Sequence, residues 1–136
     1  MNAEQYVSWS EIDSLVNTLH DIISKSSRNF SSIATLSRGG LVPSRLLADH
    51  LGIKKITVDD KTISSDTLVV DDIFDTGKTF ENILSRIDDS SKLIYATLFA
   101  RRGKKYPSQL IYGKETDGEG YVVFPWDKLE FERNQK

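Results

Sequence analysis

Short apolar strands that alternate with amphipathic helices are the feature that most constrains the fold of this chain. Segments 33–36, 67–70 and 93–99 are almost wholly apolar, which is typical of strands covered on both faces. The segments between them carry apolar residues at helical spacing. This alternation predicts an α/β domain: a mostly parallel, twisted sheet with helices on both faces. With 136 residues, the chain is expected to form a single domain, 1–136.

Local signals set the expected limits of these elements. Ser8 and Glu11 match a capping box, which predicts a helix from about Trp9 to the serine-rich run near residue 24. Pro43 suits the first turn of a second helix, and Gly52 its end. Further elements are expected as a helix with Phe80, Ile83, Leu84 and Ile87 on one side, and strands at 55–58, 109–112 and 121–124.

Composition excludes several classes of protein. The chain has 18 basic and 20 acidic residues, so it lacks the basic field of a nucleic-acid binder. It has no cysteine, which rules out disulfides, thiolate catalysis and cysteine-ligated metals. The longest apolar stretch, 93–100, is far shorter than the about 20 residues of a membrane helix, and the N-terminus does not resemble a signal peptide. We therefore expect a cytoplasmic protein with neither nucleic-acid nor membrane partners.

Two polar, glycine-containing turns directly follow apolar strands. They span residues 37–40 and 71–79. Because the carboxyl ends of parallel strands share one edge of a sheet, both turns are expected at the ligand-binding edge.

The second turn, 71–79, carries the most specific pattern. Gly77-Lys78-Thr79 suggests an ATP-binding P-loop, but that motif needs a glycine where this chain has Asp72. A calcium-binding loop that begins at Asp71 would need a glutamate at the position of Asn82. Neither motif is therefore present.

A sugar phosphate fits the same turn better. The adjacent carboxylates of Asp71 and Asp72 repel each other unless a cation or hydroxyl donors compensate. Residues 75–79 then supply amides, hydroxyls and a cation at the start of a helix, which suits one phosphate group. The pattern predicts a ribose 5-phosphate site. The alternative is an acidic helix cap with a solvated turn.

At these residues the chain resembles the type I phosphoribosyltransferases. Val-Val-Asp-Asp-Ile-Phe-Asp-Thr-Gly-Lys-Thr, 69–79, is similar to their signature for phosphoribosyl pyrophosphate (PRPP). Ser-Arg-Gly-Gly-Leu-Val-Pro, 37–43, resembles the pyrophosphate loop of the xanthine–guanine phosphoribosyltransferases, and Pro-Trp-Asp, 125–127, recurs in that subgroup. The resemblance implies the fold of that family.

The resemblance also implies roles for these residues. Asp71 and Asp72 would hold the ribose hydroxyls, partly through Mg²⁺. Asp75 would manage the proton of the purine imidazole ring as the catalytic residue. The 5-phosphate would be bound by Asp75, Thr76, Gly77, Lys78 and Thr79, and the pyrophosphate by Ser37, Arg38 and Gly39.

For the purine base, the resemblance points to residues near the C-terminus. Tyr121 would stack on the base, and the Val122 main chain would meet its exocyclic edge. Arg101 stands where the subgroup has a lysine that reads the 6-oxo group, and whether Arg101 or Arg102 does so stays open. Asp72 and Asp127 would contact the metal, Asp127 through water. The alternative is that Tyr121 and Trp126 are half-buried aromatic residues of a last strand.

The implied activity is Mg²⁺-dependent transfer from PRPP to a 6-oxopurine (guanine, xanthine or hypoxanthine), giving the nucleoside 5′-monophosphate and pyrophosphate. The alternative is a regulatory module that senses PRPP without turnover. The resemblance favours a homo-oligomer, a dimer or tetramer. The long mobile loop of related enzymes is reduced here to residues 59–66, so another segment or subunit must close the site, or the enzyme is slow.

Overall fold

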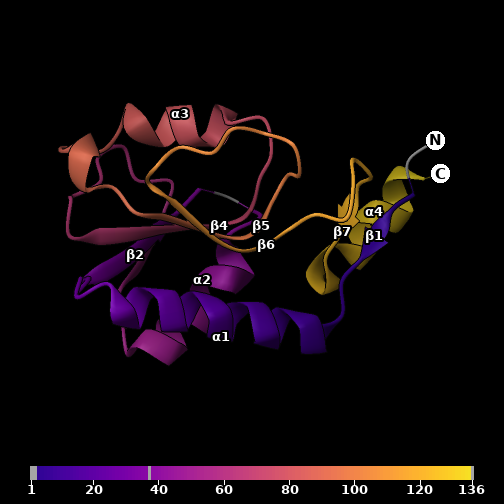
Figure 1. The fold of residues 1–136 in the computed structure, drawn as a ribbon, viewed down its shortest axis with the longest axis horizontal. Coiled ribbons are helices and arrows are strands. Elements are labelled where there is room, and N and C mark those ends of the chain that lie inside the picture. Colours follow the sequence, from indigo (N-terminus) through magenta and orange to yellow (C-terminus); the bar gives the residue numbers. More distant parts are fainter. Residues whose placement is uncertain (1–2, 37, 136) are drawn as a thin grey trace.

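Five parallel strands form the main sheet of the computed structural model, which describes residues 3–36 and 38–135 (Figure 1). Their spatial order is β3-β2-β4-β5-β6. The strands are β2 (Ser32–Thr35), β3 (Ile56–Val58), β4 (Thr67–Phe74), β5 (Tyr95–Ala100) and β6 (Leu110–Glu115). The predicted α/β fold with a mostly parallel sheet is confirmed.

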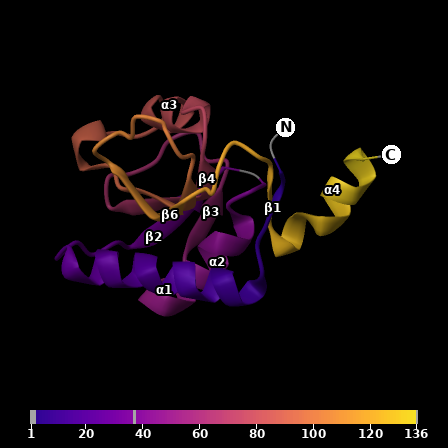
Figure 2. The same ribbon diagram turned by 45° about the vertical axis from the view of Figure 1, so that its right-hand side comes forward.

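A second, two-stranded sheet joins the two ends of the chain. It pairs β1 (Gln5–Tyr6) in parallel with β7 (Val122–Val123). The strand expected at 121–124 is therefore shorter and lies outside the main sheet, because its partner is an N-terminal segment that has no strand pattern of its own. A 3₁₀ turn, η2 (Pro125–Asp127), and a helix, α4 (Lys128–Asn134), follow; α4 projects from the body of the molecule (Figure 2).

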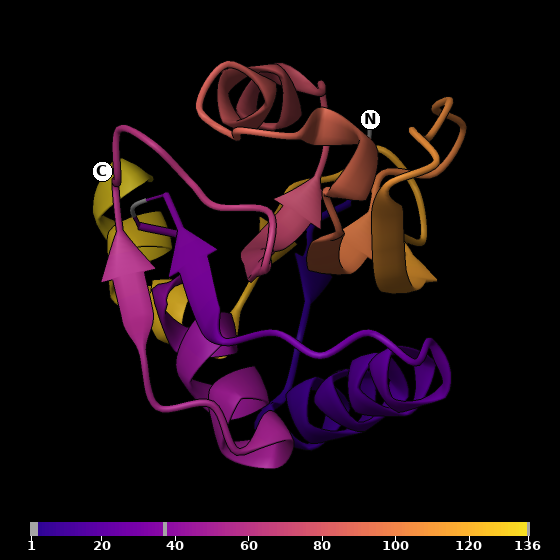
Figure 3. The same cartoon turned by 90° about the vertical axis from the view of Figure 1, so that its left-hand side faces the viewer.

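The helices cover both faces of the main sheet, as predicted (Figure 3). The helices α1 (Trp9–Lys25) and α2 (Leu41–Leu51) pack on one face, and α3 (Lys78–Leu84) covers the other. A short 3₁₀ helix, η1 (Ser90–Lys92), precedes β5. No helix within the described ranges is both long enough and apolar enough to span a membrane.

The helix limits follow the local signals closely. Ser8 Oγ accepts the Glu11 N–H at 3.1 Å at the start of α1, which confirms this half of the capping box. The second helix begins two residues before Pro43 and ends at Gly52, whose φ of +71° is the left-handed conformation that glycine favours. Ile87, expected in the third helix, lies beyond α3 and forms a bridge with Ile63.

One strand differs from expectation in a way that matters for the site. Strand β4 runs through Phe74 instead of ending at Val70, so Asp71 and Asp72 lie inside a strand and not in a loop. The extension exists because β5 continues alongside it, with Asp71 opposite Thr97. Both carboxyl groups are thereby placed on a rigid element.

Candidate active site

Two adjoining cavities lie at the carboxyl end of β4. The first has a volume of about 470 Å³ and is bordered by the end of β4, the loop after it and α3. The second, of about 520 Å³, lies between the segment after β2 and the C-terminal segments. Gly39 and Asp72 line both, so the cavities meet at these two residues. This is the edge at which open parallel sheets bind ligands.

Asp71 and Asp72 are neighbours in β4 but have different surroundings. The Tyr95 hydroxyl donates to Asp71 Oδ2 at 2.8 Å, and the Asp72 N–H donates to Asp71 Oδ1 at 2.8 Å. Asp72 Oδ1 accepts the Ile73 N–H, and a Cβ added to Gly39 would lie 2.5 Å from Asp72 Oδ2. Burial raises the pKa of Asp72 to about 8, and the charge of Asp71 adds to this rise. Asp71 is thus buried and anchored in the fold, whereas Asp72 is a partly buried acid where the cavities meet.

The loop after β4 forms a turn that leads into α3. Gly77 has φ +87°, which favours glycine over any residue with a Cβ. The Glu81 N–H is bonded to the Gly77 carbonyl, so the amides before it have no carbonyl partner within the helix. Thr76 Oγ1 accepts the Lys78 N–H at 3.4 Å. Four of the five residues expected to hold the 5-phosphate line the first cavity: Asp75, Thr76, Gly77 and Thr79.

The expected pyrophosphate loop lies between β2 and α2. Arg38 and Gly39 line the second cavity, whereas Ser37 lies outside the described residues. Arg38 Nη2 donates to Glu130 Oε2 of α4 at 3.0 Å, and both side chains are largely exposed. Arg38 is expected to bind pyrophosphate through its main-chain amide, and its side chain is engaged by a carboxylate from the C-terminal helix.

Of the residues expected to hold a base, only Tyr121 is among the described residues that line the second cavity. Tyr121 lines it, is 52% exposed and stacks on Phe131 of α4, with ring centroids 5.5 Å apart. The carbonyls of Tyr121 and Val123 accept N–H groups from the N-terminal segment. The main-chain groups of Val122 between them therefore point away from β1, since successive residues of a strand alternate in direction.

Trp126 and Asp127 form another wall of this cavity. Trp126 stacks on Phe124 with ring planes 6° apart and packs against Trp9, so it is a packing residue as well as a wall residue. Burial raises the pKa of Asp127. The charge of Asp127 contributes in turn to the raised pKa of Asp72, so the two carboxyl groups interact.

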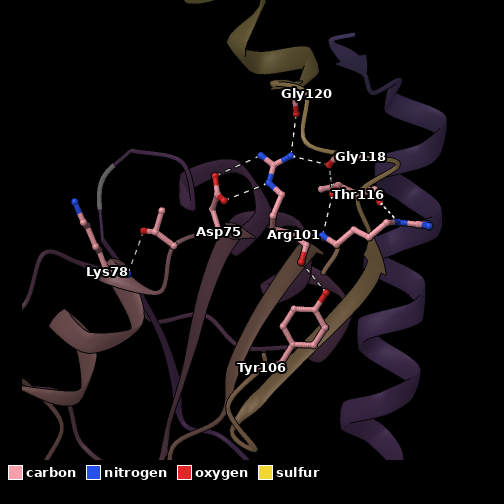
Figure 4. A network of polar contacts seen from close by, with 9 residues as sticks. Asp75, Lys78, Arg101, Tyr106, Thr116, Gly118 and Gly120 are labelled. Carbon is pink, nitrogen blue, oxygen red and sulfur yellow. Dashed lines mark hydrogen bonds and ion pairs between the residues drawn. The ribbon is translucent and has the colours of Figure 1, made fainter. Parts of the chain in front are cut away.

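Arg101 is bonded to Asp75 and does not line either cavity (Figure 4). Its Nε donates to Asp75 Oδ1 at 3.2 Å, and Nη2 donates to Asp75 Oδ2 at 3.3 Å. Its Nη1 donates to the carbonyl oxygens of Gly118 and Gly120 at 3.1 and 2.9 Å. The two residues that the resemblance assigns to different tasks thus form one ion pair.

The donor set suits a magnesium ion that is bound together with substrate. Asp72 and Asp127 supply carboxylate oxygens, which Mg²⁺ prefers. The charge of Asp127 adds to the raised pKa of Asp72, so a bound cation would offset the repulsion between the two carboxylates. The described residues contain no cluster of three or more candidate ligands. Mg²⁺ is commonly held by one or two carboxylates, water and substrate phosphates, so such a cluster is not needed.

Two residues of the first cavity were not recognised in the sequence. Tyr95 holds Asp71 from the neighbouring strand, and only the pairing of β4 with β5 places it there. Arg86 lines the cavity, with Nε bonded to Asn82 Oδ1 at 2.9 Å and Nη1 to the Asp60 carbonyl at 2.8 Å. The i, i+4 spacing of Asn82 and Arg86 is the only local signal that could have indicated this second residue.

Comparison with known proteins confirms the resemblance seen in the motifs. A curated xanthine-guanine phosphoribosyltransferase of Chromohalobacter salexigens is 27% identical to the chain over 141 residues, which cover 89% of this chain and 82% of that protein. Another, from Idiomarina loihiensis, is 26% identical and covers 93% of this chain and 88% of that protein. A search with family models gives no match.

Solved structures agree on the fold. The Helicobacter pylori xanthine-guanine-hypoxanthine phosphoribosyltransferase matches with a TM-score of 0.76 and 17% identity, over 98% of this chain and 100% of that one. A purine phosphoribosyltransferase from Pyrococcus horikoshii Ot3 matches with a TM-score of 0.71 and 22% identity, over 90% and 93%. The chain is thus similar to type I phosphoribosyltransferases in sequence motifs and in fold.

Proposed function

We propose that this chain is a purine phosphoribosyltransferase, a glycosyltransferase that converts a 6-oxopurine and PRPP to a nucleoside 5′-monophosphate and pyrophosphate with Mg²⁺. The observation that carries this proposal is the pair of cavities that meet at Asp72 and Gly39. Residues of the turn 75–79, called here the phosphate turn, line one cavity, and Tyr121 and Arg38 line the other. A sugar bound beside Asp72 would have its 5-phosphate on one side and its base and pyrophosphate on the other.

The reaction joins the purine N9 to C1 of the ribose and breaks the bond from C1 to the pyrophosphate oxygen, whose electron pair leaves with the pyrophosphate. The proton of the imidazole ring goes to Asp75. Each oxygen of this carboxylate accepts one N–H from Arg101 and retains lone pairs for the proton. General base assistance of this kind contributes about 10²–10⁴-fold to a rate.

Asp72 and Asp127 would hold Mg²⁺, which when bound neutralises the negative charge of the pyrophosphate. Asp71 would orient the ribose hydroxyls, and its own position is set by Tyr95. Arg38 and Gly39, with Ser37, would bind the pyrophosphate. We further propose that the chain forms a single domain and acts in the cytoplasm. We also propose that it forms a homo-oligomer, because residues 59–66 are too few for a long lid and a neighbouring subunit could close the site instead.

The experiment is a pyrophosphate-release assay with PRPP and guanine, xanthine, hypoxanthine or no base, with Mg²⁺ and with EDTA. We expect release that requires both a base and Mg²⁺. A parallel thermal melt with PRPP and Mg²⁺ should show stabilisation, about 2.7 kcal/mol at a ligand concentration of 100 times the Kd. Stabilisation without release for any base would identify a PRPP sensor instead. The absence of both stabilisation and pyrophosphate release would refute PRPP binding altogether.

A further inference from the structure

Arg101, beside the candidate active site, is held by hydrogen bonds from both its main chain and its side chain. It directly follows β5, and its N–H donates to the Phe74 carbonyl of β4 at 2.7 Å. Its carbonyl accepts the Tyr106 hydroxyl at 2.8 Å. The side chain is only 10% exposed. Its main chain is therefore held by hydrogen bonds to a neighbouring strand and to the partly buried Tyr106, in addition to the bonds of the guanidinium group.

The guanidinium group joins two segments that carry different parts of the proposed substrate (Figure 4). One is Asp75, at the start of the phosphate turn. The other is the turn at Gly118 and Gly120, which leads directly to Tyr121. Four of the five N–H donors of an arginine are thereby used.

The turn at 117–120 is also fastened from its other side. The Asp117 N–H donates to Gln5 Oε1 at 2.9 Å. A Cβ added to Gly120 would lie 1.7 Å from the Ala3 carbonyl oxygen, so this position requires glycine. The turn is thus held between the N-terminal segment and Arg101, and removing Arg101 would free one side of it.

We propose that Arg101 is a positioning residue that holds Asp75 and the 117–121 turn in a fixed relation, and that it does not read the 6-oxo group of the base. This inference rests on the proposed function. Its geometric basis is that Arg101 lines neither cavity and has a single N–H left to donate. Selection at position 6 of the purine then falls to other groups, and Arg101 affects catalysis through the orientation of Asp75.

The task requires an arginine. A planar guanidinium can bond both oxygens of a carboxylate on one edge and two carbonyls on another, whereas a lysine ammonium group is a point charge on a flexible stem. Arg101→Lys therefore keeps the charge and three N–H donors, which are sufficient to read a carbonyl oxygen, but loses the planar connection between the two segments. This difference separates positioning from base recognition.

The first test is a double-mutant cycle of Arg101→Lys and Asp75→Asn, with kcat and KM measured for guanine, xanthine and hypoxanthine. We expect Arg101→Lys alone to lower kcat about 10- to 100-fold, by the same factor for each base, with KM little changed. In the Asp75→Asn background the same change should cost less than about 3-fold, because the residue through which it acts is altered. Losses that multiply fully, or a change in selectivity among the bases, would overturn the proposal.

Arg28 supplies a matched control, since its Nη2 also donates to two main-chain carbonyls, those of Ser65 and Lys92 at 3.4 and 3.1 Å, and it lines neither cavity. Arg28→Lys is expected to keep parental kinetics.

A second test does not depend on activity. Amide hydrogen exchange of the ligand-free proteins should become faster in both 75–79 and 117–121 in Arg101→Lys, and in neither segment in Arg28→Lys. Unchanged exchange in either segment of Arg101→Lys would refute the connection. If the parent releases no pyrophosphate, the proposed function fails, while the exchange data still decide whether Arg101 joins the two segments.

Discussion

The fold of the ligand-free protein favours the neutral form of Asp72, whereas the proposed metal-binding role of Asp72 requires its ionised form. Its pKa is raised to about 8, first by burial and then by the charge of Asp71. The folded state therefore holds a proton that the unfolded state has released above about pH 4. It follows that the contribution of Asp72 to the free energy of unfolding decreases as pH rises from about 4 to about 8. A bound cation would favour the ionised form and remove this conflict.

We predict that Asp72→Asn raises the melting temperature of the ligand-free protein in EDTA at pH 9 and leaves it nearly unchanged at pH 5. The gain should be about 1 kcal/mol, a few degrees for a domain of this size, because a buried charge is removed. The same variant should lose Mg²⁺-dependent PRPP binding by titration. Asp71→Asn is the contrast: it disturbs the bond from Tyr95 and should destabilise the protein at both pH values. Lower stability of Asp72→Asn at pH 9 with intact PRPP binding would assign Asp72 to the fold.

Asp75 separates the enzyme from the sensor. Asp75→Asn keeps the size of the side chain and a carbonyl oxygen for Arg101, so we expect kcat to fall about 10²–10⁴-fold while PRPP affinity changes only modestly. Steady-state kinetics with three bases and direct PRPP titration measure both quantities. Full kcat in the variant, with an active parent, would show that Asp75 takes no part in proton transfer.

At the scale of elements, the phosphate turn depends on a backbone conformation at the start of α3. Gly77 has φ +87°, and an added Cβ would meet only Phe74 at 3.7 Å or more, so the cost of a side chain there is conformational and not steric. Gly52 at the end of α2 has a similar φ, +71°, with open space around it. The two glycines differ mainly in that only Gly77 lines a cavity.

We predict that Gly77→Ala and Gly52→Ala each cost about 1 kcal/mol of stability, whereas only Gly77→Ala weakens PRPP binding, about tenfold or more. Thr79→Ala should also weaken binding, through a lost hydroxyl, with little effect on stability. Thermal melts and PRPP titration of the three variants provide the comparison. Equal PRPP affinity in Gly77→Ala, Thr79→Ala and the parent would show that this turn does not bind the phosphate.

The short segment 59–66 is itself attached to the end of α3. The Ile63 N–H donates to the Arg86 carbonyl, and the Ile63 carbonyl accepts the Asp88 N–H. Arg86 Nη1 also donates to the Asp60 carbonyl. The segment corresponding to the long loop of related enzymes is thus fastened beside the first cavity, which agrees with the expectation that it is not a long lid.

At the scale of the whole molecule, α4 brings the C-terminal region to the pyrophosphate loop. The Arg38–Glu130 pair links residues 92 positions apart, and its side chains are 74% and 54% exposed. An exposed pair of this kind contributes less than about 1 kcal/mol. Its effect should therefore be seen in anion binding more than in stability.

We predict that Glu130→Gln strengthens pyrophosphate binding about two- to threefold and changes stability by less than about 0.5 kcal/mol, because Arg38 loses a competing anion. The gain should shrink at high salt. Glu132→Gln, on the same helix but lining a different groove, is the matched control and should leave pyrophosphate affinity unchanged. Titration calorimetry with pyrophosphate checks both variants. Equal gains in the two would indicate a general charge effect and not a contact with Arg38.

Features that depend on neighbours a few residues away could be predicted from the amino-acid sequence. Helical spacing and the Ser8 cap located α1, Gly52 located the end of α2, and apolar runs located the buried strands, because each of these signals acts within one turn or one strand. The glycine, hydroxyls and acids of 71–79 likewise indicated phosphate chemistry, since a turn of this kind is built from adjacent residues.

Features that depend on partners far away along the chain could be seen only in the folded molecule. Strand β4 extends to Phe74 because β5 lies beside it, and β7 leaves the main sheet because β1 is its partner. Arg101 faces Asp75 and Gly120, which are 26 and 19 residues away along the chain, because β4, β5 and the 117–120 turn converge there. The sequence shows that an arginine is present at position 101, but its bonding partner depends on which strands pair. Strand pairing in turn depends on how the whole sheet is buried.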